Sequence, residues 1–439
     1  MYSNKIFSIL ATALAVAFAA FTATAVEPSQ EVRKYANYYY AYPYPEKPLP
    51  ELSKAPAGYE PFHMEHYGRH GSRWHVDQSV YQRPIDLLRP AEKAGKLSLR
   101  GKETMAKLRV TEKQARDRAG ELTPLGARQH QGIGARMARN FPEIFGKPIH
   151  IDAKSTEVIR CILSMDNEVQ ALKAYNPDLD IATDASHSTM YYMNFEDSVA
   201  NAARKQPKAK NALKAYHKTL PIDYSAISVL YNDPKYFADS VDAKNVWNAL
   251  QRIAANSQSL PEPTQIWDLF TEQQLKNYSD RTAAEWYVRF GNTPLNNNLG
   301  PMRERYLMRN IIESADTAMM QQQPSANLRF GHDTVITPLF VLMGANGLDR
   351  VTSDLSELPS FWNLYDITPM ATNMQMIFYR PIGKKYTVDD ILVKVLVSEQ
   401  EATLPAKPVT GKYYRWSDLR SEWLSRIGDA RYPVNNSDY

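Results

Sequence analysis

Two arginines flank a histidine in the stretch Arg69-His70-Gly71-Ser72-Arg73. Each guanidinium presents a planar fork of donors that matches the oxygens of a phosphoryl group. Once those oxygens are neutralised, a neutral imidazole nitrogen of His70 can attack phosphorus and form a phosphohistidine. Gly71 has no side chain, so the backbone can approach the phosphate closely. The stretch therefore favours phosphoryl transfer, and the alternative is a surface loop without a catalytic task.

A second candidate pair, His332-Asp333, follows a segment at 327–330 that has the character of a strand. The ring of His332 can donate to a phosphoryl oxygen, and Asp333 can protonate the ester oxygen as a general acid. A His-Asp dipeptide alone is more often a capped turn than a catalytic pair. Its place at the end of a strand, together with the first motif, favours the catalytic interpretation.

The stretch from Arg69 to Arg73 resembles the Arg-His-Gly-X-Arg signature of the histidine phosphatase superfamily, and within it the histidine acid phosphatase and phytase branch. Three further stretches are similar to that branch: Leu122-Thr123-Pro124-Leu125-Gly126, Ser155-Thr156-Glu157-Val158-Ile159-Arg160 and Gly331-His332-Asp333-Thr334. The resemblance implies that His70 is the nucleophile and Asp333 the proton donor, and that the phosphate is held by Arg69, Arg73, Arg160 and His332. It also implies a phosphoglycerate-mutase-like α/β core of three layers with a mainly helical inserted domain, and catalysis without a cofactor or metal ion.

Two departures keep the subgroup open. Trp74-His75 follows the signature where a proline is usual after one more residue, which bears on the entrance to the site. The tail from 391 to 405 is similar to bacterial members described as multiple inositol polyphosphate phosphatases, which usually carry His-Ala-Glu where this chain has His332-Asp333-Thr334. The expected substrate is a phosphomonoester such as phytate or another inositol polyphosphate; a sugar phosphate such as glucose 1-phosphate is the alternative.

The elements that would position these residues can be placed from the hydrophobic pattern. Strands are expected over 61–67, 148–153, 327–330, 374–379 and 391–397, and a helix is expected to begin at Thr123-Pro124, with an N-cap hydroxyl and a proline at its first position. The pattern from 194 to 323 is helical. We therefore expect an α/β catalytic core over 26–190 and 325–439 and a helical insertion domain over 191–324.

The first 25 residues have the pattern of a cleavable secretory signal peptide. Lys5 precedes an apolar and small-residue run from 6 to 20, and Ala23-Thr24-Ala25 precedes Val26. We therefore expect a bacterial protein that is exported to the periplasm or the medium and has no membrane span after cleavage. Cys161, the only cysteine, cannot form an internal disulfide.

Composition excludes several classes of protein. The 439 residues are 44% hydrophobic and 23% charged, which fits neither a disordered chain nor a bundle of membrane spans. The net charge of +4 is too small to indicate nucleic-acid binding. A local basic stretch, from Lys96 to Arg118, would favour a highly phosphorylated substrate if it bordered the site, and would otherwise be a solvated helix face. A second basic group, from Arg204 to Lys214, is expected to be a helix surface.

Two other functions compete with phosphoryl transfer. The first is a metal enzyme, since four histidines lie close together in sequence: His63, His66, His70 and His75. Against it, a strand over 61–67 would turn His63 and His66 to opposite sides, and Arg69 would repel a metal cation. A non-catalytic module that binds phosphate esters would use the same arginines. It would not require His70 together with Asp333, and this pair favours an enzyme with an acidic pH optimum.

Overall fold

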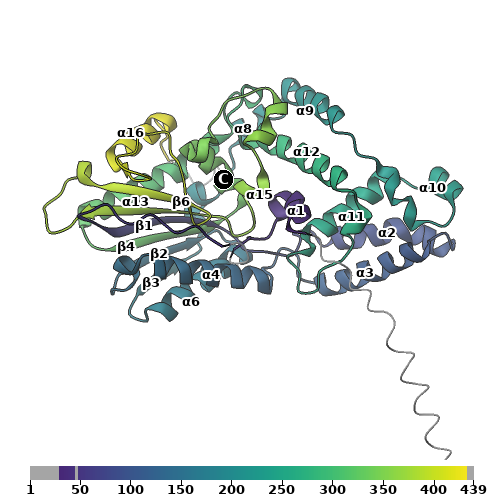
Figure 1. Cartoon of the computed structure of the whole chain (residues 1–439), viewed down its shortest axis with the longest axis horizontal. Coiled ribbons are helices and arrows are strands. Elements are labelled where there is room, and N and C mark those ends of the chain that lie inside the picture. Colours follow the sequence, from purple (N-terminus) through teal and green to yellow (C-terminus); the bar gives the residue numbers. More distant parts are fainter. Residues whose placement is uncertain (1–28, 45–47, 433–439) are drawn as a thin grey trace, which may run out of the picture.

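A computed structural model describes residues 29–44 and 48–432, so the expected signal peptide lies outside the described residues. One mixed sheet organises the molecule, in the order β3-β2-β4-β1-β5-β6-β7, with β8 paired to β6 (Figure 1). Its strands are β1 Tyr59–Arg69, β2 His150–Ser155, β3 Asp180–Asp184, β4 Ser325–Gly331, β5 Asn373–Pro381, β6 Leu392–Val397, β7 Gln400–Glu401 and β8 Tyr414–Arg415. The five strands expected from the sequence are all present, with longer or shifted ends.

The central strands of the sheet bring the motifs together. β1, β4, β2 and β3 run parallel, and the register pairs Arg69 with Gly331 and Ser155 with Phe330. Parallel strands end at the same edge of a sheet, where open α/β sheets place their ligands. The signature, the His332-Asp333 pair and the segment leading to Arg160 therefore emerge side by side.

Helices cover both faces of the sheet, which gives the core three layers. The helices α4 Pro124–Asn140 and α6 Ile159–Tyr175 lie on one face, and α13 Arg305–Gln321, α14 Asp333–Met343 and α16 Trp416–Ile427 lie on the other (Figure 1). Each face has its own buried apolar cluster. The chain thus has the α/β fold with a helical addition that its sequence motifs implied.

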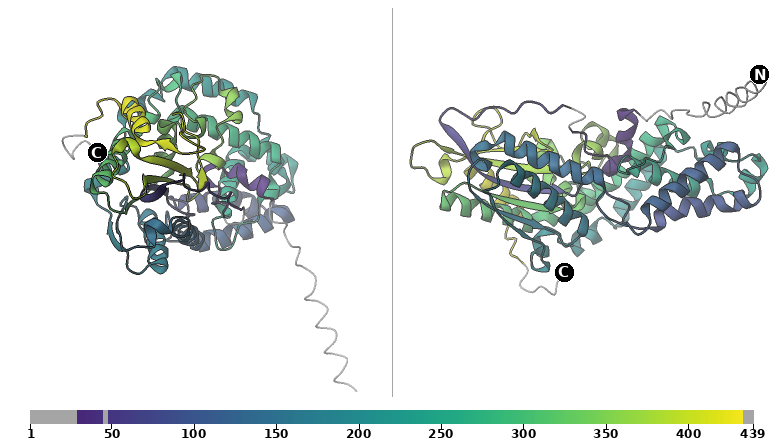
Figure 2. Two further views of the ribbon diagram at one scale, coloured as in Figure 1. Left: turned by 60° about the vertical axis from the view of Figure 1, so that its left-hand side comes forward. Right: turned by 90° about the horizontal axis from the view of Figure 1, so that it is seen from below.

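A third apolar cluster lies beyond the sheet, in a helical lobe built from two parts of the sequence. It joins α2 Ser79–Lys93 and α3 Leu99–Ala115 to α11 Ala243–Ser257 and the segment 222–275. Both figures place α2, α3, α11 and α10 Pro234–Ser240 together at one end of the molecule (Figures 1 and 2). We therefore propose that 79–115 belongs with the helical lobe, although the sequence pattern assigned it to the core.

The remaining helices are shorter or connect the two lobes. They are α1 Gln30–Arg33, α5 Pro142–Phe145, α7 Met190–Met193, α8 Ser198–Ala203, α9 Pro207–Thr219, α12 Glu272–Phe290 and α15 Leu364–Ile367. A strap from residue 29 to 44 crosses the junction, where its 3-10 helix Lys34–Tyr39 contacts α11, α12 and α15. Among the described residues, no helix has the length and apolar character needed to span a membrane.

Candidate active site

His70 stands just beyond the end of β1 with one ring nitrogen already bonded. Its Nδ1 lies 2.9 Å from the carbonyl oxygen of Gly71. A carbonyl oxygen only accepts, so Nδ1 carries the proton and the Nε2 lone pair is left available. Burial, followed by the fields of Arg160 and Arg69, holds the pKa of His70 well below its usual value. The ring is therefore neutral and able to act as a nucleophile.

His332 faces His70 from the end of β4. The two ring centroids are 5.9 Å apart and the planes are inclined by 69°. Its Nε2 lies 3.2 Å from Thr156 Oγ1, and the buried Cys161 packs against the same ring. Burial, followed by Arg160, lowers the pKa of His332 to about 4, so this imidazole is also neutral near pH 7.

Three arginines gather at the two histidines. Arg69 is fully buried, and its Nη1 donates to the Thr368 carbonyl oxygen at 2.6 Å. Arg73 lies over the ring of Tyr39, and Arg160 is the second residue of α6. Within the described residues, the Nε atoms of Arg69, Arg73 and Arg160 are buried and form no hydrogen bond. Buried donors without acceptors are costly, so this arrangement suits an incoming anion.

Asp333 is joined to the arginines through an ion pair. Its Oδ2 lies 2.6 Å from Arg69 Nη2, and its Oδ1 accepts the backbone N–H of Thr334 at 2.8 Å. Burial alone would raise the pKa of this carboxyl, but Arg69 and the other nearby cations outweigh burial and lower it. The carboxylate is therefore ionised in the free protein, and it can take up a proton only after Arg69 turns to another anion.

The backbone of the signature loop is held by the helices beneath it. Gly71 N–H donates to Ser164 Oγ at 3.1 Å, and Ser72 N–H donates to Gln129 Oε1 at 2.8 Å. Thr123 donates to the Ser72 carbonyl oxygen through both its backbone N–H and its hydroxyl. The Thr123 hydroxyl also caps α4, as the sequence predicts. Gln129 and Ser164 were missed, because nothing in their local sequence marks them as loop supports.

Trp74 and His75, the pair that departs from the signature, pack against the helical lobe. Trp74 is buried in the helical lobe cluster, and His75 Nε2 lies 3.0 Å from the Arg252 carbonyl oxygen. Burial, followed by Arg73, lowers the pKa of His75 to about 3, which leaves that ring neutral. This departure from the signature therefore anchors the loop to the helical lobe.

His63 and His66 do not join His70. His63 Nε2 pairs with Glu65 Oε1 at 3.0 Å, whereas His66 faces Glu168. Within residues 29–44 and 48–432, no three His, Cys, Asp or Glu side chains are grouped as a metal site would require. The sequence argument that placed these two histidines on different sides of a strand therefore agrees with their observed contacts.

The basic stretch from Lys96 to Arg118 is largely paired with acids. Its ion pairs include Lys96–Asp233, Arg100–Asp268, Arg109–Glu92 and Arg116–Glu112. Such exposed pairs describe a solvated helix surface. The stretch therefore offers little unpaired positive charge to a substrate.

Arginines from three separate segments form a second cluster, and only one of them, Arg204, was considered from the sequence. Burial, followed by Arg303, lowers the pKa of Arg204, and burial, followed by Arg204 and Arg303, lowers the pKa of Arg289. Glu196 acts on both of these arginines and lies 3.5 Å from Arg303 Nη2. The field of Asp333 also reaches Arg289. In the described part of the chain, the Nε atoms of all three are buried without a partner. Arg204 was expected to be surface, and Arg289 and Arg303 had no motif around them.

Comparison with known proteins supports this reading of the fold. The model of the histidine phosphatase superfamily (branch 2) matches residues 68–398. No curated protein sequence matches the chain. The multiple inositol polyphosphate phosphatase of Bifidobacterium longum, solved in complex with inositol hexasulfate, has a TM-score of 0.73 at 17% identity and covers 90% of this chain and 98% of its own.

Two phytase structures share the fold more distantly. The phytase from D. castellii has a TM-score of 0.65 at 15% identity, with 92% of this chain and 86% of that chain covered. The Hafnia alvei phytase in complex with tartrate has a TM-score of 0.51 at 14% identity, with 86% and 99% covered. The family match spans both halves of the site, from the signature to the strands beyond Asp333. The chain therefore belongs to the histidine phosphatase superfamily, branch 2, and is a phosphatase.

Proposed function

We propose that this phosphatase hydrolyses phosphomonoesters through a phosphohistidine formed on Nε2 of His70. The observation that carries the proposal is the hydrogen bond from His70 Nδ1 to Gly71, since it fixes the tautomer with a free Nε2 lone pair among three arginines. Arg69, Arg73, Arg160 and His332 would neutralise and orient the phosphoryl oxygens. The buried Nε atoms of these arginines, which have no hydrogen-bond partner among the described residues, support this role.

The reaction would proceed in two balanced steps. In the first, the Nε2 lone pair forms a bond to phosphorus while the ester P–O bond breaks, and Asp333 gives its proton to the leaving oxygen. In the second, water attacks phosphorus, the Asp333 carboxylate takes the water proton, and the N–P bond breaks to release phosphate. A bound phosphate would compete with Asp333 for Arg69, which frees the carboxyl to carry a proton.

The nucleophile is tested by His70→Asn. We expect kcat to fall by at least about a thousandfold, with the thermal unfolding midpoint close to that of the parent, because the ring of His70 bonds to the neighbouring Gly71 and its backbone contacts remain in the variant. Protein mixed with labelled substrate and quenched in alkaline denaturant should carry base-stable, acid-labile phosphate in the parent and none in the variant. Activity within a few-fold of the parent would overturn the assignment.

We further propose a substrate with several phosphates, such as phytate. The cluster of Arg204, Arg289 and Arg303 supports this, since it holds three cations around one carboxylate next to the site and could receive a phosphate that is not being cleaved. The B. longum phosphatase binds the hexasulfate of inositol, a compound with the same distribution of anions. A sugar monophosphate such as glucose 1-phosphate would leave the cluster unused.

Phosphate release from phytate, glucose 1-phosphate and an aryl phosphate separates these substrates. In Arg289→Ala, kcat/KM for phytate should fall about tenfold or more while the aryl phosphate is little affected, because only phytate reaches the cluster. Lys102→Ala, in the exposed basic stretch, is the matched control and should change neither value. Equal effects of Arg289→Ala on all three substrates would contradict the second anion site.

We also propose that the protein is exported before it acts. The apolar run from 6 to 20 and the Ala23-Thr24-Ala25 sequence support cleavage after Ala25. Protein recovered from the periplasmic fraction or the medium of a bacterial host should begin at Val26. Recovery of the uncleaved chain in the cytoplasm would contradict this proposal.

A further inference from the structure

The peptide group between Arg69 and His70 is held at both of its polar atoms. The His70 N–H donates to the Gly331 carbonyl oxygen at 2.9 Å, and the Arg69 carbonyl oxygen lies 3.1 Å from His130 Nε2. This rigid group joins the nucleophile to a phosphate-binding arginine, so its plane sets the direction in which both side chains leave the backbone. Contacts that fix this plane therefore fix the placement of His70 and Arg69.

His130 lies in α4, beneath the loop, and is backed by a carboxylate. Its Nδ1 is 2.8 Å from Glu168 Oε2, and both side chains are 0% exposed. The Arg69 carbonyl oxygen can only accept, so His130 Nε2 must carry a proton. Glu168 Oε2 faces Nδ1, and the one proton between these two atoms completes a hydrogen bond that holds the ring with its Nε2–H directed at Arg69.

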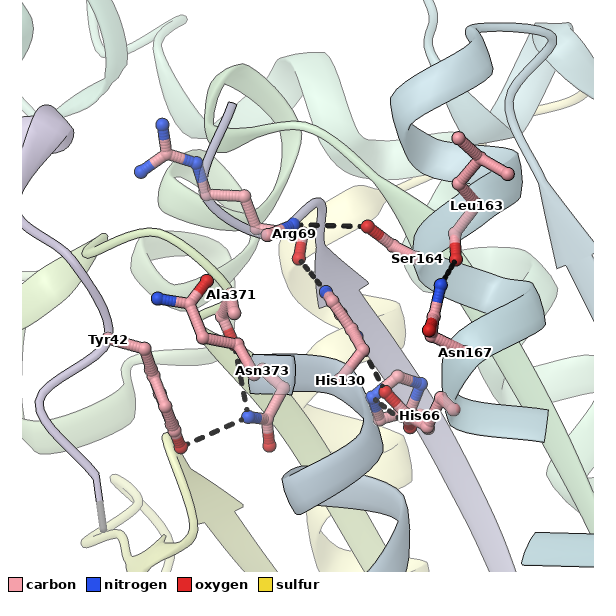
Figure 3. Close-up of polar contacts among 12 residues, drawn as sticks. Tyr42, His66, Arg69, His130, Leu163, Ser164, Asn167, Ala371 and Asn373 are labelled. Carbon is pink, nitrogen blue, oxygen red and sulfur yellow. Dashed lines mark hydrogen bonds and ion pairs between the residues drawn. The ribbon is translucent and has the colours of Figure 1, made fainter. Parts of the chain in front are cut away.

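A third buried side chain, His66, also faces Glu168 but does not compete for the proton between Glu168 and His130. His66 Nε2 is 3.6 Å from Glu168 Oε1, a longer separation than a normal hydrogen bond. Burial lowers the pKa of His66 to about 4, so its ring is neutral near pH 7. Figure 3 shows His130 between Arg69 on one side and His66 on the other.

One face of α6 carries residues that support these contacts as well as a proposed phosphate-binding arginine. Arg160, Ser164 and Glu168 follow one another at four-residue spacing, so they lie along the same side of the helix. Ser164 holds Gly71 N–H, and Glu168 holds His130. The helix that presents a phosphate-binding arginine therefore also supports the loop that carries the nucleophile.

We propose that His130 is a positioning residue for phosphoryl transfer and that Glu168 holds its tautomer. The inference rests on the proposed function, because it concerns the placement of His70 and Arg69 for attack on phosphorus. Neither His130 nor Glu168 touches the substrate; each acts through the Arg69–His70 peptide group. Outer groups that orient reacting side chains are commonly worth about ten- to a hundredfold in activity.

Two variants of His130 test the hydrogen bond itself. His130→Leu removes the donor to Arg69, and kcat for an aryl phosphate should fall about tenfold or more. His130→Gln places an amide N–H where Nε2 stands, and kcat should stay within about threefold of the parent. Equal losses in both variants, or no loss in either, would overturn the role of the donor.

The pair His63–Glu65 provides a matched control on β1, the strand that leads to Arg69. It is also fully buried, with His63 Nε2 3.0 Å from Glu65 Oε1, but it bonds Ser325 and lies away from the loop. His63→Leu should lower the thermal unfolding midpoint as His130→Leu does, while its kcat stays within about twofold of the parent. If both variants lose only stability, His130 is merely structural.

Glu168 supplies a second test that does not depend on the folding of His130→Leu. Glu168→Gln can still fix the His130 tautomer with an amide N–H to Nδ1 and should keep kcat within about threefold. Glu168→Leu releases the tautomer and should cost about tenfold. Equal activity of the two Glu168 variants would overturn its role. A fully active His70→Asn would instead overturn the proposed function, so the two failures are distinguishable.

Discussion

At the scale of single residues, the site keeps the imidazole of His70 neutral although arginines surround it. An exposed histidine has a pKa near 6.5 and would be partly charged in acid, but the buried His70 is kept neutral by Arg160 and Arg69. The same cations keep Asp333 ionised until an anion arrives. In the proposed mechanism, substrate binding would couple to the protonation of Asp333, because the phosphoryl group would take over the interaction that Arg69 makes with this carboxylate.

This electrostatic arrangement predicts a pH profile with its maximum on the acidic side. The lowered pKa of His70 means that its nucleophilic form persists as pH falls below 6.5. The lowered pKa of Asp333 in the free protein means that its protonated form declines as pH rises toward neutrality. We expect kcat/KM for a phosphate ester to be higher at pH 5 than at pH 7.5. An acid limb near pH 6.5 would contradict a neutral His70.

The acid role of Asp333 can be tested with leaving groups of different quality. Asp333→Asn cannot supply a proton, so kcat for an alkyl ester such as glucose 1-phosphate should fall by about 10²- to 10⁴-fold. An activated aryl ester leaves without a proton and should be slowed far less. Equal slowing of both esters would indicate that Asp333 only orients Arg69, to which it is bonded at 2.6 Å.

At the scale of elements, the start of α4 fits closely against the signature loop. A Cβ on Gly126 would lie 2.2 Å from the Ser72 carbonyl oxygen, and one on Gly71 would lie 2.5 Å from the Gly126 carbonyl oxygen. Both obstacles are backbone atoms. We expect Gly126→Ala to lower the free energy of unfolding by about 1–3 kcal/mol and to reduce kcat, because the loop must shift.

A glycine in the same helix provides the control for that substitution. A Cβ on Gly132 would meet Nη1 of Arg136 at 2.9 Å, a side-chain atom that can shift slightly while Nε and Nη2 keep their bonds to Glu399. Gly132→Ala should raise the free energy of unfolding by about 0.5–1 kcal/mol, since alanine loses less conformational entropy in a helix. Denaturant unfolding and kcat measured for both variants would check this; a harmless Gly126→Ala would contradict the close fit.

The motifs were readable from the sequence because each follows a strand, and parallel strands end together. Strand ends that precede His70 and His332 indicated that these two residues would meet, and β1 does pair with β4. The place of Arg160 came from the family resemblance, and the pairing of β2 with β4 brings its segment to the same edge. Arg289, His130 and Glu168 could not be anticipated, since their partners lie on other elements and their helices are otherwise ordinary. The packing of α2 and α3 on α11 was also hidden, because an amphipathic helix does not reveal which apolar surface it covers.

At the scale of the whole molecule, the site lies between two lobes with separate apolar clusters. The core supplies His70, Arg160 and Asp333, while the lobe anchors the signature through Trp74 and His75. The strap adds a third connection, since Tyr39 contacts both Arg73 and His75. The position of the helical lobe relative to the sheet therefore bears directly on the signature loop.

Double-mutant cycles can test whether 79–115 and 222–275 form one folding unit. Leu88 in α2 and Leu250 in α11 are buried in the same cluster, whereas Leu328 in β4 is buried in a cluster of the core. Each leucine-to-alanine change should cost about 2–5 kcal/mol of unfolding free energy. Leu88→Ala and Leu250→Ala should be non-additive by about 0.5 kcal/mol or more, because they loosen one cluster, and Leu88→Ala with Leu328→Ala should be additive. If Leu88→Ala were additive with Leu250→Ala but coupled to Leu328→Ala, α2 would belong to the core. The proposal of a helical lobe built from two parts of the sequence would then be wrong.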